Sequence, residues 1–425
     1  MYVDSYNSQS LMKKEANSVT DFRSWRFLRI MANPVFLVRT LWADPRPFLP
    51  TLFIGSFLLG GYYCIVDLQQ HRGYFDLLGN ISSRGILHDG VPLTRDFTGI
   101  PDIDDIIQQV VVSSWPLASC EMPALTLFGL YYLGQLMALH SVVTISGLRA
   151  GNVQTIMALT TFWGIFYQCI PWGILMPVYW ISFLWISPTA TAKGLVEKVQ
   201  TSYINIAAAM ALPYSVIGGF IVPSALASLP TSIMPSHSLK QLLVAVWHLY
   251  PVYISTLQFA LTELFKLMFH VPVAEKQSAE QRLAAQKRMY TLLANIASLV
   301  HLGVLWFILS PSLVSRLGFS TDSPWTKLSF RQVFVPGYPT SQAPFTSVTE
   351  GTLAQLQYDL LFATGSSIAF ALYRDGFQPG RTLIMLQRIT LYGPAGAVLV
   401  WEKEQDEIVL RAAMQIEKAD KEHKE

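Results

Sequence analysis

Charge is what this sequence has least of. Only 14% of its 425 residues are charged and 52% are hydrophobic, whereas about a quarter of the residues of a soluble domain carry charge. The mean hydropathy is positive. The formal net charge at pH 7 is only +2, so the balance does not favour binding to nucleic acid. The composition predicts a membrane protein whose partners are the lipid bilayer and apolar molecules.

Clustered cysteine and histidine ligands are also missing. Cys64, Cys120 and Cys169 stand in or beside apolar runs, form no CxxC pair and predict no disulfide framework. We interpret them as small packing residues. The eight histidines are scattered without HxxH or HxxxH spacing, which argues against a membrane di-iron oxygenase. We expect no metal site.

Motifs that bind phosphate or activate a serine are absent as well. The chain has no P-loop, no GxGxxG after a strand, no GxSxG and no haem-attachment motif. It also lacks the paired aspartate-rich motifs with which a Mg²⁺-dependent prenyltransferase holds a diphosphate. We therefore expect no cofactor, and what remains for an enzyme is proton chemistry on an apolar substrate.

Long apolar runs are what the sequence has in abundance. A helix needs about 20 apolar residues to cross a bilayer, and the sequence predicts an all-α, polytopic transmembrane bundle of eight or nine spans. The uncertain count comes from a run broken by Pro171 and Pro177, which is either a helical hairpin or one tilted, broken span, since a single helix would be about 52 Å long. The expected spans are 48–66, 123–145, 153–187, 203–229, 239–262, 290–309, 353–373 and 383–400.

The segments around these spans suggest an orientation. Residues 1–47 contain basic and aromatic side chains that predict a cytoplasmic tail with an interfacial helix, and we expect no cleavable signal peptide. Residues 48–401 form the transmembrane domain, in which a lumenal loop carries the glycosylation sequon at Asn80. Residues 402–425 predict a charged, solvated tail. We expect a multi-pass protein of the endoplasmic reticulum membrane, with the side of the C-terminus left open.

One candidate proton donor lies where the second span begins. Glu121 stands in Cys-Glu-Met-Pro, and a carboxyl group at the membrane boundary among apolar neighbours holds its proton more tightly than one in water. The alternative is a carboxylate that stabilises the start of a helix through the macrodipole. A second candidate, Asp359, lies about 9 Å inside its span. An ionisable group at that depth indicates function, or else an interhelical hydrogen bond.

A third acidic site precedes these two in the chain. Residues 102–105 read Asp-Ile-Asp-Asp, the D-x-D-D form with which class II terpene cyclases protonate an alkene or an epoxide. Asp104 and Asp105 are therefore candidate acids. The alternative interpretation is an acidic first turn that opens a helix over 106–112.

Aromatic residues and a buried arginine are the candidate substrate-binding groups. An aromatic-lined cavity holds a polyprenyl chain and stabilises carbocations through ring quadrupoles, although an interfacial aromatic belt gives a similar pattern. Arg388 lies deep in its span, where we expect a carboxylate or carbonyl partner. The aromatic candidates come from the long broken run and are Trp163, Tyr167, Trp172 and Trp180.

Helix length limits which of these groups share a site. Glu121 and Arg149 stand at the two ends of one predicted helix, about 42 Å apart, so Arg149 is interpreted as an anchor or part of a separate gate. With nine spans Asp359 joins Glu121 at the lumenal face. With eight spans Arg388 does so instead.

Three stretches resemble a known family. They are TGIPDIDDIIQQVVVSSWP, the helix start at Glu121, and the Gly-Leu-Arg-Ala-Gly-Asn exit at 147–152. They are similar to the fungal integral-membrane terpene cyclases of meroterpenoid pathways of the ascofuranone type. The resemblance implies that the chain cyclises an epoxidised farnesyl chain on an aromatic head group in secondary metabolism. Its partners are then a hydrophobic prenylated substrate and other enzymes of the same pathway.

We hypothesise that Glu121 or Asp359 opens the epoxide and that aromatic side chains shelter the cation. Loss of a proton or capture by an internal hydroxyl group then ends the reaction. A transporter or exporter of a secondary metabolite is the competing hypothesis, although no repeat of half-chain length supports the duplicated transporter folds. A non-catalytic membrane scaffold is the third.

Overall fold

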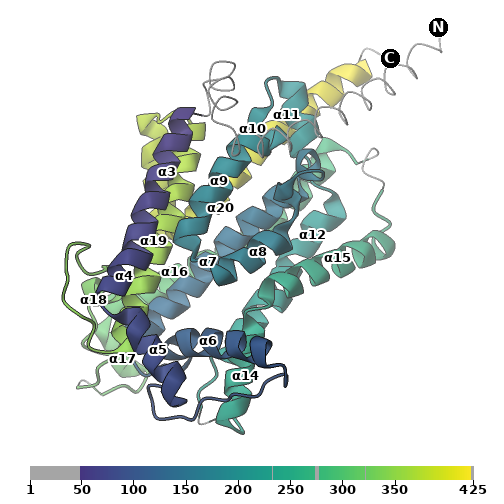
Figure 1. Ribbon diagram of the computed structural model, residues 1–425. Coiled ribbons are helices and arrows are strands. Elements are labelled where there is room, and N and C mark those ends of the chain that lie inside the picture. The colour runs from purple at the N-terminus through teal and green to yellow at the C-terminus, as the bar shows by residue number, and fades with distance from the viewer. Residues whose placement is uncertain (1–47, 232, 273–276, 321, 423–425) are drawn as a thin grey trace, which may run out of the picture.

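The computed structural model describes residues 48–231, 233–272, 277–320 and 322–422. These residues form helices joined by loops, and the pairing of Ile86 with Pro92 is the one β-bridge among them. The expected all-α class is therefore confirmed (Figure 1). The interfacial helix expected within 1–47 lies outside the described residues.

Five helical segments are long and apolar enough to cross a membrane. A sixth is added if α14 (His237–Trp247) and α15 (Tyr250–Met268), which are bent by 62°, form one span. The eight or nine spans expected are not confirmed. The first segment, Phe48–His71, consists of α3 (Phe48–Tyr62), η1 (Tyr63–Asp67) and α4 (Leu68–His71). Another, Ile206–Ala227, consists of α12 (Ile206–Val216), η4 (Ile217–Ile221) and α13 (Val222–Ala227). The other three are α7 (Pro123–Leu148), α16 (Ala279–Leu309) and Pro379–Ala419 within α20 (Pro379–Glu422).

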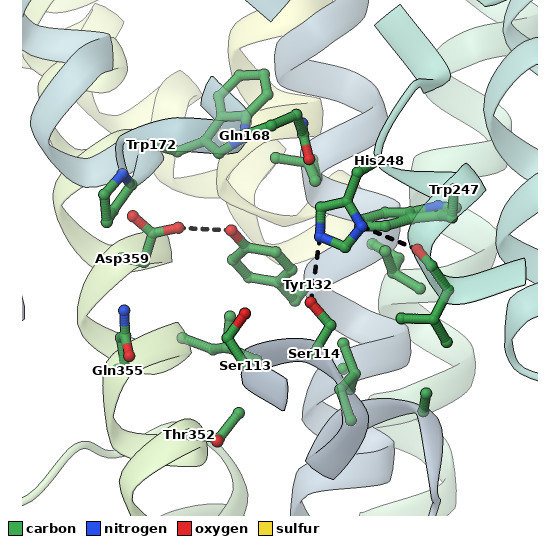
Figure 2. Close-up of a pocket in the computed structure, with 18 of the residues that line it drawn as sticks. Ser113, Ser114, Tyr132, Gln168, Trp172, Trp247, His248, Thr352, Gln355 and Asp359 are labelled. Carbon is green, nitrogen blue, oxygen red and sulfur yellow. Dashed lines mark hydrogen bonds between the residues drawn. The ribbon is translucent and has the colours of Figure 1, made fainter. Parts of the chain in front are cut away.

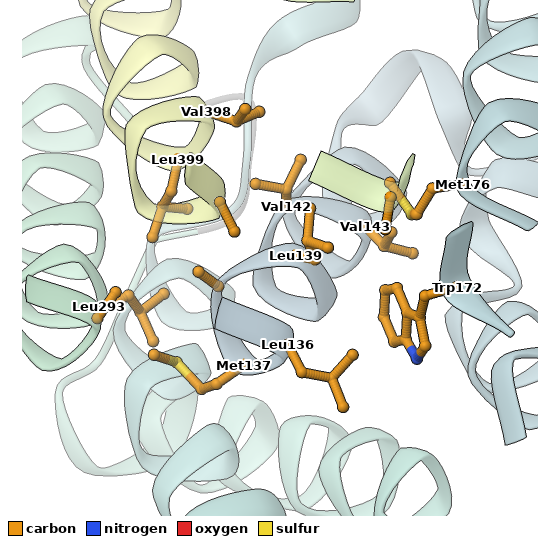
Figure 3. Packing of buried hydrophobic residues seen from close by; sticks show 14 of the residues in the cluster. Leu136, Met137, Leu139, Val142, Val143, Trp172, Met176, Leu293, Val398 and Leu399 are labelled. Atoms are coloured by element: carbon orange, nitrogen blue, oxygen red, sulfur yellow. The ribbon is translucent and has the colours of Figure 1, made fainter. Parts of the chain in front are cut away.

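The helix α7 forms the centre of the bundle. Pro123 occupies its first turn, where the missing N–H costs nothing. The helix contains no Asp, Glu, Lys or Arg, and most of its side chains are buried, so neighbouring helices pack around its whole circumference. Figure 3 shows Leu139 and Val142 of α7 close to Val398 and Leu399 of α20. On its other side α7 faces Met176 of α9 (Figure 3).

The long broken run folds as a short hairpin. It consists of α8 (Thr160–Cys169) and α9 (Trp172–Ile186), which at 1.5 Å per residue are only about 15 Å and 22 Å long. The rings of Trp163 and Tyr179 lie 5.1 Å apart, whereas sixteen residues of one straight helix would separate them by about 24 Å. The chain therefore reverses at Pro171, which ends the preceding helix by holding Ile170 extended.

The last expected span, 383–400, is also a hairpin and not a single crossing. Gly393 has a φ of 75° and interrupts α20. Arg388 forms an ion pair with Glu404, which sixteen residues of a straight helix would hold about 24 Å away, so the two arms of α20 run antiparallel. Gln135 of α7 provides hydrogen-bond partners for the backbone groups at this break. Its side chain accepts from the N–H of Ala395 at 2.9 Å and donates to the carbonyl of Tyr392 at 3.3 Å.

The expected boundary at residue 402 is not a structural one. The second arm of α20 continues to Glu422 and packs along α16. Glu402 and Asp406 are 3% and 4% exposed, so this part of the predicted solvated tail is buried.

Short helices close one end of the bundle. In Figure 1, α5 (Tyr74–Arg84), α6 (Pro101–Ala118) and α14 lie across the end of the bundle at which α7 begins. α19 (Val348–Arg374) runs beside α3 and packs on α9. The remaining helices are η2 (Ala150–Asn152), η3 (Ile156–Ala158), α10 (Pro188–Thr191), α11 (Leu195–Ser202), α17 (Pro311–Arg316) and α18 (Phe330–Phe334).

Candidate active site

A cavity of about 610 Å³ lies between the short helices and the first half of α7. Its volume is in the range typical of sites for small organic ligands. Its walls come from α6, α7, the tip of the α8–α9 hairpin, the α13 and α14 region, and the first half of α19. Most of the lining is apolar, and Figure 2 shows the few polar groups that face it.

Asp359 is the acidic residue of this lining. It is 3% exposed. One carboxyl oxygen accepts a hydrogen bond from the hydroxyl of Tyr132 at 2.5 Å, and the other accepts from the backbone N–H of Gly173 at 2.6 Å. Within the described part of the chain no lysine, arginine or histidine forms an ion pair with it. It is a buried acid with two neutral donors and no cation.

Gly173 is placed for this contact by the hairpin. It follows Pro171 and Trp172 at the start of α9, where backbone N–H groups have no partner inside the helix. A Cβ atom at this position would lie 2.8 Å from the backbone oxygen of Asp359. Only glycine therefore lets α9 approach α19 closely enough for the hydrogen bond to form.

The wall of the cavity facing Asp359 carries a histidine and a serine. His248, at the break between α14 and α15, lies 3.1 Å through its Nε2 from the Ser114 hydroxyl oxygen. Its Nδ1 lies 2.9 Å from the carbonyl oxygen of Val244. Because a carbonyl only accepts, Nδ1 carries the proton and neutral Nε2 accepts from Ser114. Figure 2 shows Tyr132 between this pair and Asp359.

Two of the four predicted aromatic residues line the cavity. Tyr167 and Trp172 stack with ring centroids 3.8 Å apart at the hairpin tip. The other two are buried elsewhere. Trp163 donates to the carbonyl of Ile156 at 3.0 Å, and Trp180 donates to Ser367 at 2.8 Å. Neither of these tryptophans lines the cavity.

Glu121 does not line the cavity, although its neighbour Cys120 does. Cys120 has a φ of 58°, and this left-handed residue turns the chain between α6 and α7. The Glu121 side chain is 49% exposed and lies 3.2 Å from Nε2 of His88. The carboxylate therefore lies beside a histidine at the surface of the bundle and outside the cavity.

Asp104 and Asp105 do not line the cavity either. Asp104 is 4% exposed and accepts hydrogen bonds from the backbone N–H groups of Phe97, Thr98 and Gly99 and from the Thr98 hydroxyl, at 2.7–3.2 Å. Burial by itself raises the pKa of Asp104, but these donors outweigh it and hold the pKa below its ordinary value of 3.8. Asp104 thus fastens the loop before α6 as a carboxylate, while Asp105 is exposed.

The remaining predicted residues lie away from the cavity. Arg388 has the carboxylate partner expected of it, Glu404. Asn80 is exposed and lies within α5. Among the described residues, no group of three or more His, Cys, Asp or Glu side chains lies close enough to hold a metal.

The sequence interpretation missed most of the polar lining. His248 was only one of eight scattered histidines, and the serines of α6 stood inside an apolar amphipathic stretch. The available signal was local: Trp247-His248 falls where α14 ends before Pro251. The missed groups are Ser113, Ser114, Tyr132, Gln168, Trp247, His248, Thr352 and Gln355.

Comparison with known proteins identifies the family. The family model described as the CtvD domain matches residues 50–410. Terpene cyclase ascI from Acremonium egyptiacum is 25% identical over 83% of this chain and 89% of its own length. Terpene cyclase penA from Penicillium crustosum is 26% identical over 69% of this chain and 75% of its own. Terpene cyclase ctvD from Aspergillus terreus is 23% identical over 81% and 96%.

No solved structure matches the chain. The resemblance to fungal terpene cyclases drawn from the sequence is confirmed by these relatives. Because the family model covers most of its length, the chain belongs to the CtvD-domain family.

Proposed function

We propose that this protein is a membrane-bound terpene cyclase that opens an epoxide on a farnesyl chain carried by an aromatic head group, with Asp359 as the acid. The observation that supports this most is that Asp359 is buried on the cavity wall without a cation. The relatives are terpene cyclases, which supports cyclisation of a terpene over transport. The cavity itself argues against a purely structural scaffold.

The surroundings of Asp359 suit an acid that must first take up a proton and then donate it to the substrate. Burial in an apolar wall disfavours an uncompensated charge, so the carboxyl group takes up a proton here more readily than it would in water. Once the proton passes to the epoxide oxygen, the Tyr132 hydroxyl and the Gly173 N–H stabilise the carboxylate that remains. The carbon–oxygen bond then breaks, its electron pair stays on the oxygen, and a cation forms on the chain.

The aromatic lining then stabilises the cation. Tyr167 and Trp172 stack at the hairpin tip, and Trp247 lines the opposite side of the cavity near His248. The faces of such rings attract positive charge without reacting as nucleophiles, and an apolar cavity excludes the water that would capture the cation early.

The apolar helices support a membrane location. We propose six crossings, by α3 with α4, α7, α12 with α13, α14 with α15, α16, and α19. The α8–α9 hairpin and α20 then enter from the side on which α7 ends. The endoplasmic reticulum is the proposed membrane. An oxygenase that makes the epoxide is the proposed pathway partner, because an epoxide oxygen comes from an oxidation that proton chemistry does not supply.

The direct test compares two acids in microsomes that contain the full-length protein. The probe is a phenol that carries a farnesyl chain with a terminal epoxide, and product formation is followed by chromatography and mass spectrometry. We expect Asp359→Asn to lose cyclisation and Glu121→Gln to keep it. Full activity in Asp359→Asn, with normal accumulation of the protein, refutes the assignment of the acid.

A further inference from the structure

We propose that His248 and Ser114 together accept the proton that leaves the substrate at the end of the cyclisation. The proposal rests on the proposed function and adds a second catalytic group on the opposite wall of the same cavity. It also gives a role to a hydrogen-bonded polar pair in the lining of a mostly apolar cavity.

Either ending of the reaction requires a proton acceptor. If an alkene forms, a C–H bond next to the cationic carbon breaks and its electron pair becomes the new π bond. If an internal hydroxyl group captures the cation, the resulting oxonium ion loses its O–H proton. One proton enters at the epoxide and one leaves at the end, so the overall reaction is an isomerisation without an oxidant or a reductant.

The geometry of His248 fits an acceptor. Its Nδ1–H donates to the Val244 carbonyl, which leaves a lone pair on Nε2 directed at Ser114, 3.1 Å away. Of the described residues that line the cavity, His248 is the one with a neutral basic nitrogen. Ser114 also lines the cavity, and Figure 2 shows its hydroxyl group directed at the imidazole of His248.

The proton leaves the substrate through two coupled transfers. The Ser114 oxygen takes the proton from the substrate while its own hydroxyl proton passes to Nε2 of His248. The imidazolium that results is stabilised by the Val244 carbonyl, which already accepts from Nδ1. Return of that proton to the Asp359 carboxylate through solvent, after the product leaves, restores both groups.

Three other hydroxyl groups of the cavity lining are bound to backbone carbonyl groups. Ser113 donates to the Val110 carbonyl at 3.0 Å, and Ser224 donates to the Phe220 carbonyl at 2.8 Å. Thr352 donates to the carbonyl of Val348 at 2.9 Å. Each of these hydroxyl protons is bound to a backbone oxygen, which cannot carry a proton onward. The Ser114 hydroxyl is bound to a nitrogen that can.

The experiment measures two quantities in the same microsomes with the same epoxyfarnesyl phenol. These are the rate at which the epoxide disappears and the ratio of the wild-type product to products of water capture. The variants are His248→Gln and Ser114→Ala. Ser113→Ala serves as the matched control for the ratio, because it removes a hydroxyl group from the same wall without touching His248.

We expect His248→Gln to consume epoxide within about 10-fold of the wild-type rate while formation of the wild-type product falls about 100-fold, a typical contribution of general base catalysis. Ser114→Ala should shift the ratio in the same direction, and Ser113→Ala should leave it unchanged. Unchanged ratios in both His248→Gln and Ser114→Ala overturn the inference and return the proton to Asp359. If the wild type consumes no epoxide, the proposed function fails first.

Discussion

The two ends of α7 each meet buried carboxylates, and the two ends differ in what surrounds them. At the end where α7 terminates, Arg149 is 3% exposed and donates to Glu402 at 2.5 Å and to Asp406 at 2.8 Å. The hydroxyl of Tyr290 donates to Asp406 at 2.6 Å. In the half where α7 begins, Asp359 has two neutral donors and a cavity beside it.

This difference separates a structural acid from a reactive one. The guanidinium of Arg149 favours the charged form of the two carboxylates that it contacts, because an opposite charge nearby stabilises that form. A buried carboxyl group without a cation is protonated more easily, and the neighbouring cavity is where that proton can be delivered. No residue of the Arg149 cluster lines the cavity.

The largest expected effect distinguishes the two ends by activity. Asp359→Asn should lower the turnover of the epoxyfarnesyl phenol by about 10²–10⁴-fold, the usual contribution of a general acid. Asp406→Asn should leave turnover per folded molecule within about 10-fold, because Asp406 does not reach the cavity. Initial rates, normalised to folded protein in detergent, measure both. Equal losses of turnover in the two variants would contradict the assignment of Asp359 as the reactive acid and Asp406 as a structural one.

The second prediction distinguishes the ends by stability. Arg149→Met removes the guanidinium that pairs with buried Glu402 and Asp406 and should cost about 3–5 kcal/mol of folding free energy. We expect little monodisperse protein in size-exclusion chromatography after detergent extraction. Asp359→Asn, which keeps a polar side chain between the same two donors, should elute like the wild type. A well-behaved Arg149→Met protein contradicts the structural role.

A smaller effect should come from a donor to the reactive acid. Tyr132→Phe removes one hydrogen bond from the Asp359 carboxylate formed during the reaction. A hydrogen bond to a charged group is worth about 1.5–3 kcal/mol, so the turnover number should fall by about 10- to 150-fold. Tyr131→Phe is the control, because this adjacent buried tyrosine does not line the cavity. An unchanged turnover number in Tyr132→Phe would show that the carboxylate needs only Gly173.

The smallest effect concerns the loop before α6. Asp104→Ala should lower the unfolding temperature at neutral pH, and Asp105→Ala, at an exposed position, should not. Because the pKa of Asp104 is lowered in the folded protein, its contribution to stability is fully present above 3.8 and is lost as the pH falls through the lowered value. The difference between Asp104→Ala and wild type should therefore shrink below about pH 4 in thermal unfolding scans.

The sequence predicted best those features that depend on neighbouring residues or on how deep a residue lies within an apolar helix. Pro123 begins α7 as expected, the long run is broken at Pro171, and Tyr167 and Trp172 line a cavity. The arms of the hairpin at Pro171 are only 10 and 15 residues long, so the two membrane spans predicted for it are not confirmed. The depth of Asp359 in an apolar helix placed it among the candidates. That reasoning needs only helix geometry and the cost of burying a charge.

The rest depended on contacts between distant residues. Glu402 and Asp406 read as the start of a solvated tail, because their partner Arg149 lies more than 250 residues earlier. The direction in which the Glu121 side chain points depends on the left-handed backbone conformation of Cys120. No local sequence pattern predicts that conformation. The reversal at Gly393 is satisfied by Gln135 from another helix, so an apolar run there looks like an ordinary span.

The break in α20 has a consequence for the biogenesis of the protein. Its bare carbonyl and N–H groups have no place in lipid, and Gln135 offers them partners only once α7 is in position. During synthesis α7 emerges from the ribosome long before α20. The α20 hairpin can therefore pack into the bundle only after α7 and its neighbouring helices have assembled. In a Gln135→Leu variant we expect the earlier helices to insert normally and α20 to fail to pack against α7.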